Sequence, residues 1–227
     1  MTDLIDLEGD SPSNLAQALE RLSADELVAF PTETVWGLGA RAFSHAALER
    51  LRSFKGRAAD QPVSVLIDQP EALASFGVEQ TPLLTAIVEA FWPGPLTLVV
   101  SCSRDSDFAP GVANAAGAIG FRCSDHPVTA QLVREASARG LGPVTATSFN
   151  LSGQTPVGTQ AEAELLAKSH AQILTVLDAA TCEAGGSEPS TVLDLTDAKP
   201  RVLRFGAVTL EELEPVLEGF HGLAARR

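Results

Sequence analysis

The chain has 227 residues, a length that fits one large α/β domain and requires no second one. Apolar residues make up 45% of it and charged residues 20%, so it can bury a full core and does not belong with disordered proteins. Its 16 lysines and arginines stand against 29 aspartates and glutamates, and the net charge of −13 disfavours broad binding to nucleic-acid backbones while still allowing a local basic pocket.

Compartment signals are sparse and point the same way. The acidic N-terminal segment lacks a basic stretch followed by an apolar one, and no run of about 18 apolar residues occurs, so we expect neither a signal peptide nor membrane contact. The cysteines Cys102, Cys123 and Cys182 are widely separated and show no CxxC spacing. We expect them to be small buried fillers in a reduced, cytoplasmic protein.

The first half of the chain predicts alternating helices and strands. Capping residues followed by apolar positions at helical spacing predict helices that begin after Ser11, Ser44 and Thr81. Apolar runs predict strands at 26–30, 63–67 and 96–100. The first of these strands runs into Pro-Thr-Glu-Thr and Trp36, after which Gly-Leu-Gly reads as a turn.

The second half continues the alternation. Strands are predicted at 118–121, 144–147, 173–177, 191–195 and 202–203, and helices at 127–138, 159–167 and 209–218. The last two helices open with capping boxes at Thr159 and Thr209. Interleaved helices and strands predict one α/β domain over residues 1–227, built on a mixed sheet.

Familiar catalytic motifs are absent from the sequence. It contains no GxxxxGK[ST] phosphate loop, no GxGxxG, no GxSxG and no HExxH. The histidines, which we expect to be surface or structural, are scattered at His45, His126, His170 and His221 and show no metal-ligand spacing. Any nucleotide chemistry must therefore use another scheme, without a protein metal centre.

Two cations close to the end of the second predicted helix form a candidate site. Lys55 and Arg57 precede Ala-Ala-Asp-Gln-Pro, where the helix cannot continue. A guanidinium and an ammonium held together in this way can clamp a polyphosphate. The alternative is a pair of solvated cations placed favourably at a helix C-terminus.

Other candidates follow predicted strands. Ser148 and Asn150 come after one strand and can contact a phosphate or a base edge, or else form an ordinary turn. Arg122 and Arg204 each end a strand, which alone is weak evidence for a site. Ser190 begins a strand, where a hydroxyl usually caps the strand end.

Taken together, these segments resemble the YrdC-like threonylcarbamoyl-AMP synthase family. The resemblance covers roughly residues 15 to 210 and rests on seven segments in family order: PTETVWGLGA, Lys55-x-Arg57, FWPGPLTLVV, the Arg122 segment ending in HP, SFNLSG, STVLDL and LRFGAV. It implies a twisted mixed sheet flanked by helices around a deep cavity. It also implies formation of threonylcarbamoyl-AMP and pyrophosphate from L-threonine, bicarbonate and ATP, for tRNA modification.

The same resemblance implies a role for each matched residue. The expected threonine contacts are Thr34, Arg122 and Ser190; the expected phosphate contacts and catalytic residues are Lys55 and Arg57; the other expected ATP contacts are Gln61, Ser148, Asn150 and Arg204. Magnesium is expected to bridge the phosphates with few direct protein ligands. We expect Lys55→Ala and Arg57→Ala each to abolish activity without unfolding the protein.

Several positions depart from the usual family pattern. Trp36 stands where tyrosine or phenylalanine is common, Phe149 places a large side chain in the turn expected to approach the nucleotide, and Gln61, Leu66, Ala118 and Phe205 also differ. The cations of the proposed phosphate clamp are retained. These departures leave the exact substrate and its affinity open from the sequence.

Two other functions remain open from the sequence. A related enzyme would form a carbamoyl adenylate, as similar domains do in larger hydrogenase-maturation and antibiotic-carbamoylation proteins. A non-catalytic paralogue would bind RNA, which the charge of −13 opposes, although a basic cavity mouth would allow a weak tRNA contact. For the leading function, the product would pass to a separate complex that transfers the threonylcarbamoyl group to tRNA.

Overall fold

A computed structural model describes residues 12–56, 61–170, 173–175, 186 and 188–220 of the chain. The strands are β1 (Leu27–Phe30), β2 (Gly37–Gly39), β3 (Ser64–Leu66), β4 (Leu96–Ser101), β5 (Ala118–Arg122), β6 (Val144–Ser148), β7 (Ile173–Thr175), β8 (Thr191–Asp194) and β9 (Arg201–Arg204). They form one sheet in the order β7-β1-β2-β6-β3-β5-β4-β8-β9. Because β1–β7, β3–β5 and β4–β8 are parallel and the other pairs antiparallel, the predicted mixed sheet is confirmed.

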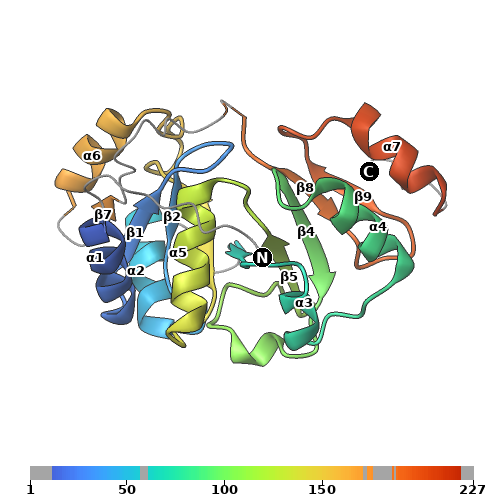
Figure 1. Ribbon diagram of the computed structural model, residues 1–227, viewed down its shortest axis with the longest axis horizontal. Helices are drawn as coiled ribbons and strands as arrows, with labels where there is room; N and C mark the ends of the chain where they lie inside the picture. The colour runs from blue at the N-terminus through green and yellow to red at the C-terminus, as the bar shows by residue number, and fades with distance from the viewer. Residues whose placement is uncertain (1–11, 57–60, 171–172, 176–185, 187, 221–227) are drawn as a thin grey trace.

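Helices surround the sheet (Figure 1). They are α1 (Pro12–Ser23), α2 (His45–Lys55), α3 (Ala72–Ser75), α4 (Pro82–Phe91), α5 (Pro127–Ala138), α6 (Gln160–Lys168) and α7 (Leu210–Glu218), with a 3₁₀ turn at Asp105–Asp107. The predicted caps at Ser44, Thr81, Thr159 and Thr209 are confirmed, since each side-chain oxygen accepts a backbone N–H of the first helical turn. None of the described helices is long and apolar enough to cross a bilayer.

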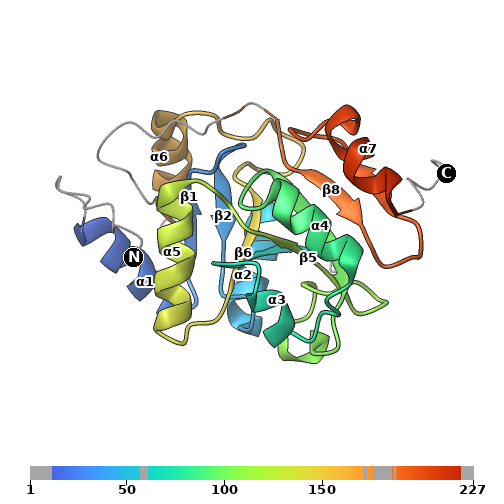
Figure 2. The same cartoon turned by 45° about the vertical axis from the view of Figure 1, so that its right-hand side comes forward.

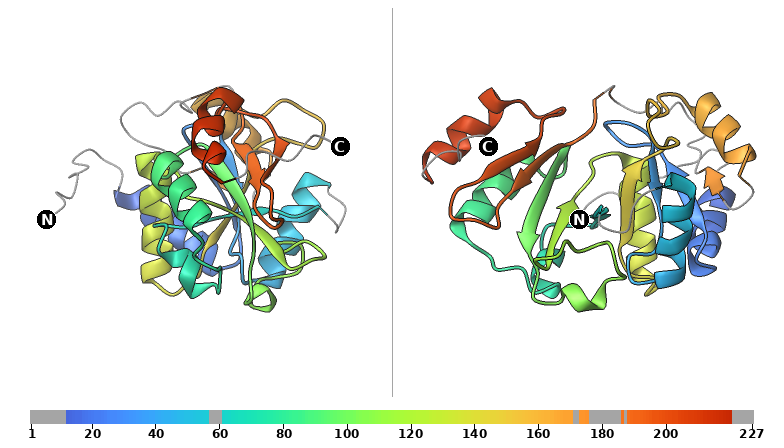
Figure 3. Two further views of the ribbon diagram at one scale, coloured as in Figure 1. Left: turned by 90° about the vertical axis from the view of Figure 1, so that its right-hand side faces the viewer. Right: turned by 180° about the vertical axis from the view of Figure 1, so that it is seen from behind.

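The helices bury two separate hydrophobic cores. The α1 and α5 helices lie side by side and cover the β1 part of the sheet (Figure 2), where Leu19, Phe30 and Leu132 belong to the smaller core. The α4 and α7 helices pack against each other near β4 and β8, at the other end of the sheet (Figure 3). The larger core joins this end to α2 and α6.

The central strands present different side chains on their two faces. On β5, Ile119 and Phe121 belong to the larger core, whereas Ala118, Gly120 and Arg122 line a cavity. On β4, Leu96, Leu98 and Val100 likewise enter the core, and Thr97 and Val99 line the cavity. Because alternate residues of a strand face opposite sides, small and polar residues at every second position leave one face hollow.

The β2 strand corrects one prediction. Gly37–Gly39 is a buried strand between β1 and β6, not a turn. Sequence patterns missed it because two of its three residues lack the side chains that mark a strand. A Cβ on Gly37 or Gly39 would lie 2.6 Å or 2.7 Å from the Phe30 ring. These glycines therefore permit close approach to an aromatic ring rather than a bend.

Other differences are small. The helix α3 and the 3₁₀ turn were not predicted, since each spans less than about one and a half helical turns and shows no periodicity. The strand predicted at 191–195 ends at Asp194, and the one at 202–203 extends over Arg201–Arg204. Ser11, residues 176–177 and His221 lie outside the described residues.

The described cysteines are free and buried, as expected of fillers. Burial, together with nearby carboxylates such as Asp68, raises the pKa of the Cys123 thiol to about 11. Burial also raises the pKa of Cys102. Both thiols therefore stay protonated at neutral pH. Cys182 lies outside the described residues.

Replacing Gly39 by alanine should destabilise the fold by about 2 kcal/mol or more. The added Cβ would lie 2.6 Å from the Thr145 carbonyl oxygen and 2.7 Å from both Phe30 and Val144. In a chain of this size the melting temperature should fall by about 4–8 °C. The matched control is Gly219→Ala, because this glycine has a φ of −64° and open space around its Cβ position. Equal melting temperatures for the two variants would contradict the packing argument.

Candidate active site

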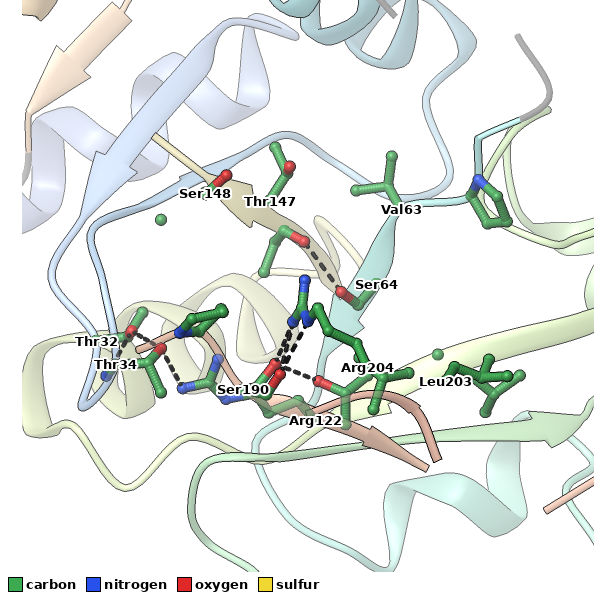
Figure 4. Close-up of a pocket in the computed structure, with 18 of the residues that line it drawn as sticks. Thr32, Thr34, Val63, Ser64, Arg122, Thr147, Ser148, Ser190, Leu203 and Arg204 are labelled. Carbon is green, nitrogen blue, oxygen red and sulfur yellow. Dashed lines mark hydrogen bonds between the residues drawn. The ribbon is translucent and has the colours of Figure 1, made fainter. Parts of the chain in front are cut away.

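The hollow face of the sheet forms a cavity of about 310 Å³ (Figure 4). Strands β2, β3, β4, β5, β6, β8 and β9 all contribute residues to its wall, together with the loop that follows β1. The volume lies at the lower end of the range for small-molecule sites. The lining includes Arg122 and Arg204 and, within the described chain, no acidic residue. The cavity is therefore locally cationic in a chain of charge −13.

Arg122, the last residue of β5, is held at one end of the cavity. Its Nη2 lies 2.6 Å from Glu33 Oε1, and its Nε donates to the same oxygen at 3.2 Å. Nη2 also donates to Thr34 Oγ1 at 3.0 Å (Figure 4). The Ser124 hydroxyl donates to the other oxygen of Glu33. The guanidinium is thus oriented by a partly buried acid, and its Nη1 has no hydrogen-bond partner among the described residues.

The acid that orients Arg122 also affects a neighbouring carboxyl group. Burial raises the pKa of Asp125, and the Glu33 carboxylate raises it further, while Arg122 partly opposes both.

The Arg122 side chain is 8% exposed and that of Glu33 13% exposed. Such a pair is stable only when both partners stay in place, because removing one leaves a buried charge.

Arg204 and Ser190 form a second polar group. Arg204 donates to the Ser190 carbonyl from Nε at 3.1 Å and from Nη2 at 2.7 Å, and Nη2 also donates to the Ser190 hydroxyl at 3.0 Å. The Ser190 hydroxyl lies 2.9 Å from Thr97 Oγ1. A residue expected at the threonine site thus touches one expected at the nucleotide site.

Lys55, the last residue of α2, lies beside the cavity rather than in its lining. Its Nζ donates to the carbonyls of Ser148 and Asn150 at 2.7 and 2.9 Å and to Asn150 Oδ1 at 2.6 Å. With 2% of its surface exposed, Lys55 is not a solvated surface cation. It anchors the chain where β6 ends, and Ser148, the last residue of β6, does line the cavity.

The structure brings together five of the residues predicted from the sequence. The cavity wall contains Thr34, Arg122, Ser148, Ser190 and Arg204. Lys55 and Asn150 contact each other outside this lining, and Gln61 is exposed and also outside it. Arg57 lies outside the described residues. The ligand contacts expected for all nine residues stay predictions.

The structure shows where four of the departures from the family pattern lie. Phe149 is fully buried in the larger core and packs against Phe54, with ring centroids 5.9 Å apart. The large side chain that the sequence places in this turn therefore lies in the core. Leu66 lies in the smaller core, whereas Ala118 lines the cavity. Trp36 is fully buried in the larger core and also belongs to the cavity wall.

Sequence patterns assigned no individual role to several polar residues of the site. Thr32, Ser64 and Thr97 line the cavity, and Glu33 and Ser124 hold Arg122. A usable signal existed for Ser64 and Thr97, since each is a polar residue inside an otherwise apolar strand. The Glu33–Arg122 pair spans 89 positions in sequence and carries no local signal.

The composition of the wall suits an anionic ligand with its own cation. Guanidinium groups and hydroxyls hydrogen-bond carboxylates and phosphates. Among the described residues, no group of three or more histidines, cysteines or acids could hold a metal ion. Mg²⁺ commonly binds through substrate phosphates and water with few protein ligands, and the magnesium expected with ATP stays a prediction.

The fold and the cavity define an α/β protein with a cavity suited to small anionic ligands on one face of a mixed sheet. A sequence profile of the Sua5/YciO/YrdC family, described as "Telomere recombination", matches residues 20–206. The chain belongs to this family.

Relatives and solved structures agree with that assignment. A threonylcarbamoyl-AMP synthase of Bacillus subtilis is 35% identical over 96% of this chain and 61% of its own length, and a Mycobacterium tuberculosis relative is 36% identical over 89% and 88%. The crystal structure of Pyrococcus abyssi Sua5 complexed with L-threonine superposes with a TM-score of 0.79 and 32% identity, covering 89% of this chain and 57% of the other. The chain thus spans less than two thirds of two of these proteins.

Proposed function

We propose that the chain is a nucleotidyltransferase that forms threonylcarbamoyl-AMP and pyrophosphate from L-threonine, bicarbonate and ATP. The observation that carries the proposal is the cavity of about 310 Å³, which Arg122 and Arg204 line together with the hydroxyl residues Thr34, Ser148 and Ser190. The Bacillus relative bears the name of this activity, and the Pyrococcus structure was solved with L-threonine. Both likenesses support assigning the cavity to these substrates.

The two ends of the cavity suit different parts of the substrates. Arg122 is oriented by Glu33 and can bind the threonine carboxylate through Nη1, with Thr34 beside it. Arg204 and Ser148 line the part assigned to the nucleotide. Ser190 contacts Arg204 and lies between the two. This arrangement would place the amino acid next to the α-phosphate.

The reaction needs positioning more than a nucleophilic side chain. Bicarbonate and the threonine amine form N-carboxythreonine with loss of water. An oxygen of that carboxylate then forms a bond to the α-phosphorus while the bond to the leaving pyrophosphate breaks. The described site contributes fixed cations and hydroxyls, which favour the charged transition state and hold the reactants in line. Lys55 and Arg57 are the residues proposed to stabilise the phosphates.

The remaining assignments belong to the same proposal. Magnesium would enter with ATP and neutralise phosphate charge. The product would pass to a separate complex that modifies tRNA, and the enzyme would work in the cytoplasm. Two described cysteines that are free and buried are compatible with a reducing compartment.

Pyrophosphate release provides the test. Purified protein with ATP, magnesium and bicarbonate should release pyrophosphate only when L-threonine is added, because the amino acid supplies the attacking group. Omitting bicarbonate should stop release in the same way. A coupled pyrophosphate assay measures the rate, and mass spectrometry identifies the adduct of AMP and carboxylated threonine.

The other outcomes are distinct. Release without threonine, or none at all, would overturn the proposal. Release that depends on carbamoyl phosphate would identify a carbamoyl-adenylate-forming enzyme. Tight RNA binding without turnover would identify a non-catalytic RNA-binding protein.

A further inference from the structure

Thr32 is a buried residue whose hydrogen bonds determine whether the hydroxyl of the nearby Thr34 donates or accepts in their contact. Its Oγ1 donates to the Val35 carbonyl at 2.7 Å and accepts the Thr34 backbone N–H at 3.1 Å. The same Oγ1 lies 2.8 Å from Thr34 Oγ1. A threonine hydroxyl has one hydrogen, and the one on Thr32 is already used for Val35. Thr34 must therefore be the donor in the contact between the two hydroxyls.

This direction leaves the Thr34 hydroxyl with a single remaining capacity. Its hydrogen points to Thr32, and one of its lone pairs accepts the N–H of Arg122 Nη2 at 3.0 Å. A hydroxyl oxygen accepts at two positions, so one lone pair stays available. Thr34, which lines the cavity, can thus accept a hydrogen bond from a ligand but cannot donate one.

Arg122 presents the opposite polarity next to this acceptor. Its Nη1 can only donate, whereas Thr34 Oγ1 can only accept. A ligand that matches both groups carries an anionic acceptor and an N–H or O–H donor on adjacent atoms. An α-amino acid has this pattern, with its carboxylate on Arg122 and its amine or hydroxyl on Thr34.

We propose that Thr32 is a specificity-determining positioning residue: it holds the Thr34 hydroxyl as an acceptor, so that the cavity selects carboxylates bearing an adjacent hydrogen-bond donor. The proposal deepens the proposed function, on which it rests for the cavity's binding of an amino acid. A ligand with a carbonyl in place of the amine would set two acceptors against each other, which costs binding free energy.

The test compares two ligands on one carbon skeleton, L-2-aminobutyrate and 2-oxobutyrate, which differ in the donor at the α-carbon. Calorimetry measures the affinity of each for the wild type, Thr32→Val and Thr32→Ser. Valine has the shape of threonine without the hydroxyl, so Thr34 becomes free to donate into the cavity. Serine keeps the hydroxyl and serves as the rescue variant. Thermal melts establish that each variant is folded.

The wild type and Thr32→Ser should both prefer the amine. In Thr32→Val the ratio of the two affinities should fall about tenfold, which is the effect of one ordinary hydrogen bond. An unchanged ratio in Thr32→Val, with both ligands weakened alike, would overturn the proposal and show a purely structural role. A wild type without preference for the amine would also overturn it.

Failure of the proposed function would look different. Threonine-dependent pyrophosphate release with an unchanged ratio in Thr32→Val would reject the role of Thr32 and retain the enzyme. The expected loss of preference, in a protein that releases no pyrophosphate, would retain the role of Thr32 and reject the enzyme.

Discussion

Replacing Arg122 by alanine should lower threonine-dependent pyrophosphate release at least about 100-fold. The change removes the guanidinium proposed to bind the substrate carboxylate, and it leaves Glu33 buried without the partner now 2.6 Å away. Truncating one member of a buried charge pair between two binding partners costs about 2–5 kcal/mol of binding free energy, and each 1.4 kcal/mol corresponds to a factor of ten. Steady-state kinetics with threonine and ATP varied separately will show the loss mainly in the threonine response.

Two further variants test that explanation. Arg122→Lys retains the charge but loses the planar fork, so it should raise the KM for threonine while changing the KM for ATP little. The matched control is Arg21→Ala, which removes an arginine that also pairs with an acid, Glu26, but lies on α1 outside the cavity. Wild-type activity in Arg122→Ala would show that Arg122 does not bind the substrate carboxylate.

Local signals determine which parts of the fold are predictable. Helices with an oxygen-bearing cap and a spaced apolar face, such as those after Ser44 and Thr209, were located to within a residue, because both signals lie inside one segment. Strand order was not predictable, since β6 pairs with β2 and β3 from far earlier in the chain. The short strand β2 was missed because two of its residues are glycines, which leave space for the Phe30 ring and carry no side-chain pattern typical of a strand.

In the candidate site, too, single residues could be predicted from local signals, whereas contacts between distant segments could not. Arg122, Ser190 and Arg204 were predicted as single residues at strand ends, and the sheet brings them to one cavity. What holds each of them was not predictable: Glu33 for Arg122 and the Ser190 carbonyl for Arg204 are contacts across the sheet. Sequence motifs thus identify groups able to touch a ligand, whereas their orientation is a tertiary property.

Lys55 shows why that distinction matters for the chemistry. From the sequence it is a cation for phosphates, whereas the structure has its ammonium bonded to three oxygens of the Ser148–Asn150 segment. Both roles are compatible if the ammonium organises the segment that faces the nucleotide. Substitution should then affect stability as well as catalysis, which differs from the expectation drawn from sequence alone.

Replacing Lys55 by alanine should lower both activity and stability. Losing a fixed cation beside the phosphates should cost about 10²–10³-fold in turnover. The backbone carbonyl oxygens of Ser148 and Asn150 and the side-chain oxygen of Asn150 would lose a buried donor. The free energy of unfolding should therefore fall by about 2–3 kcal/mol. The melting temperature should therefore drop by about 5–10 °C. Differential scanning calorimetry and the pyrophosphate assay measure the two effects on the same preparation.

The control for this variant is Lys168→Ala, in which the lost ammonium is 76% exposed and pairs only weakly with Glu164 on the same helix. Its melting temperature and turnover should stay near those of the wild type. An inactive Lys55→Ala with an unchanged melting temperature would mean that the ammonium serves the nucleotide and not the segment after β6. Full activity with a lower melting temperature would mean the reverse, leaving the phosphates to Arg57 and Arg204. Only loss of both supports one ammonium that orders the segment and acts on the phosphates.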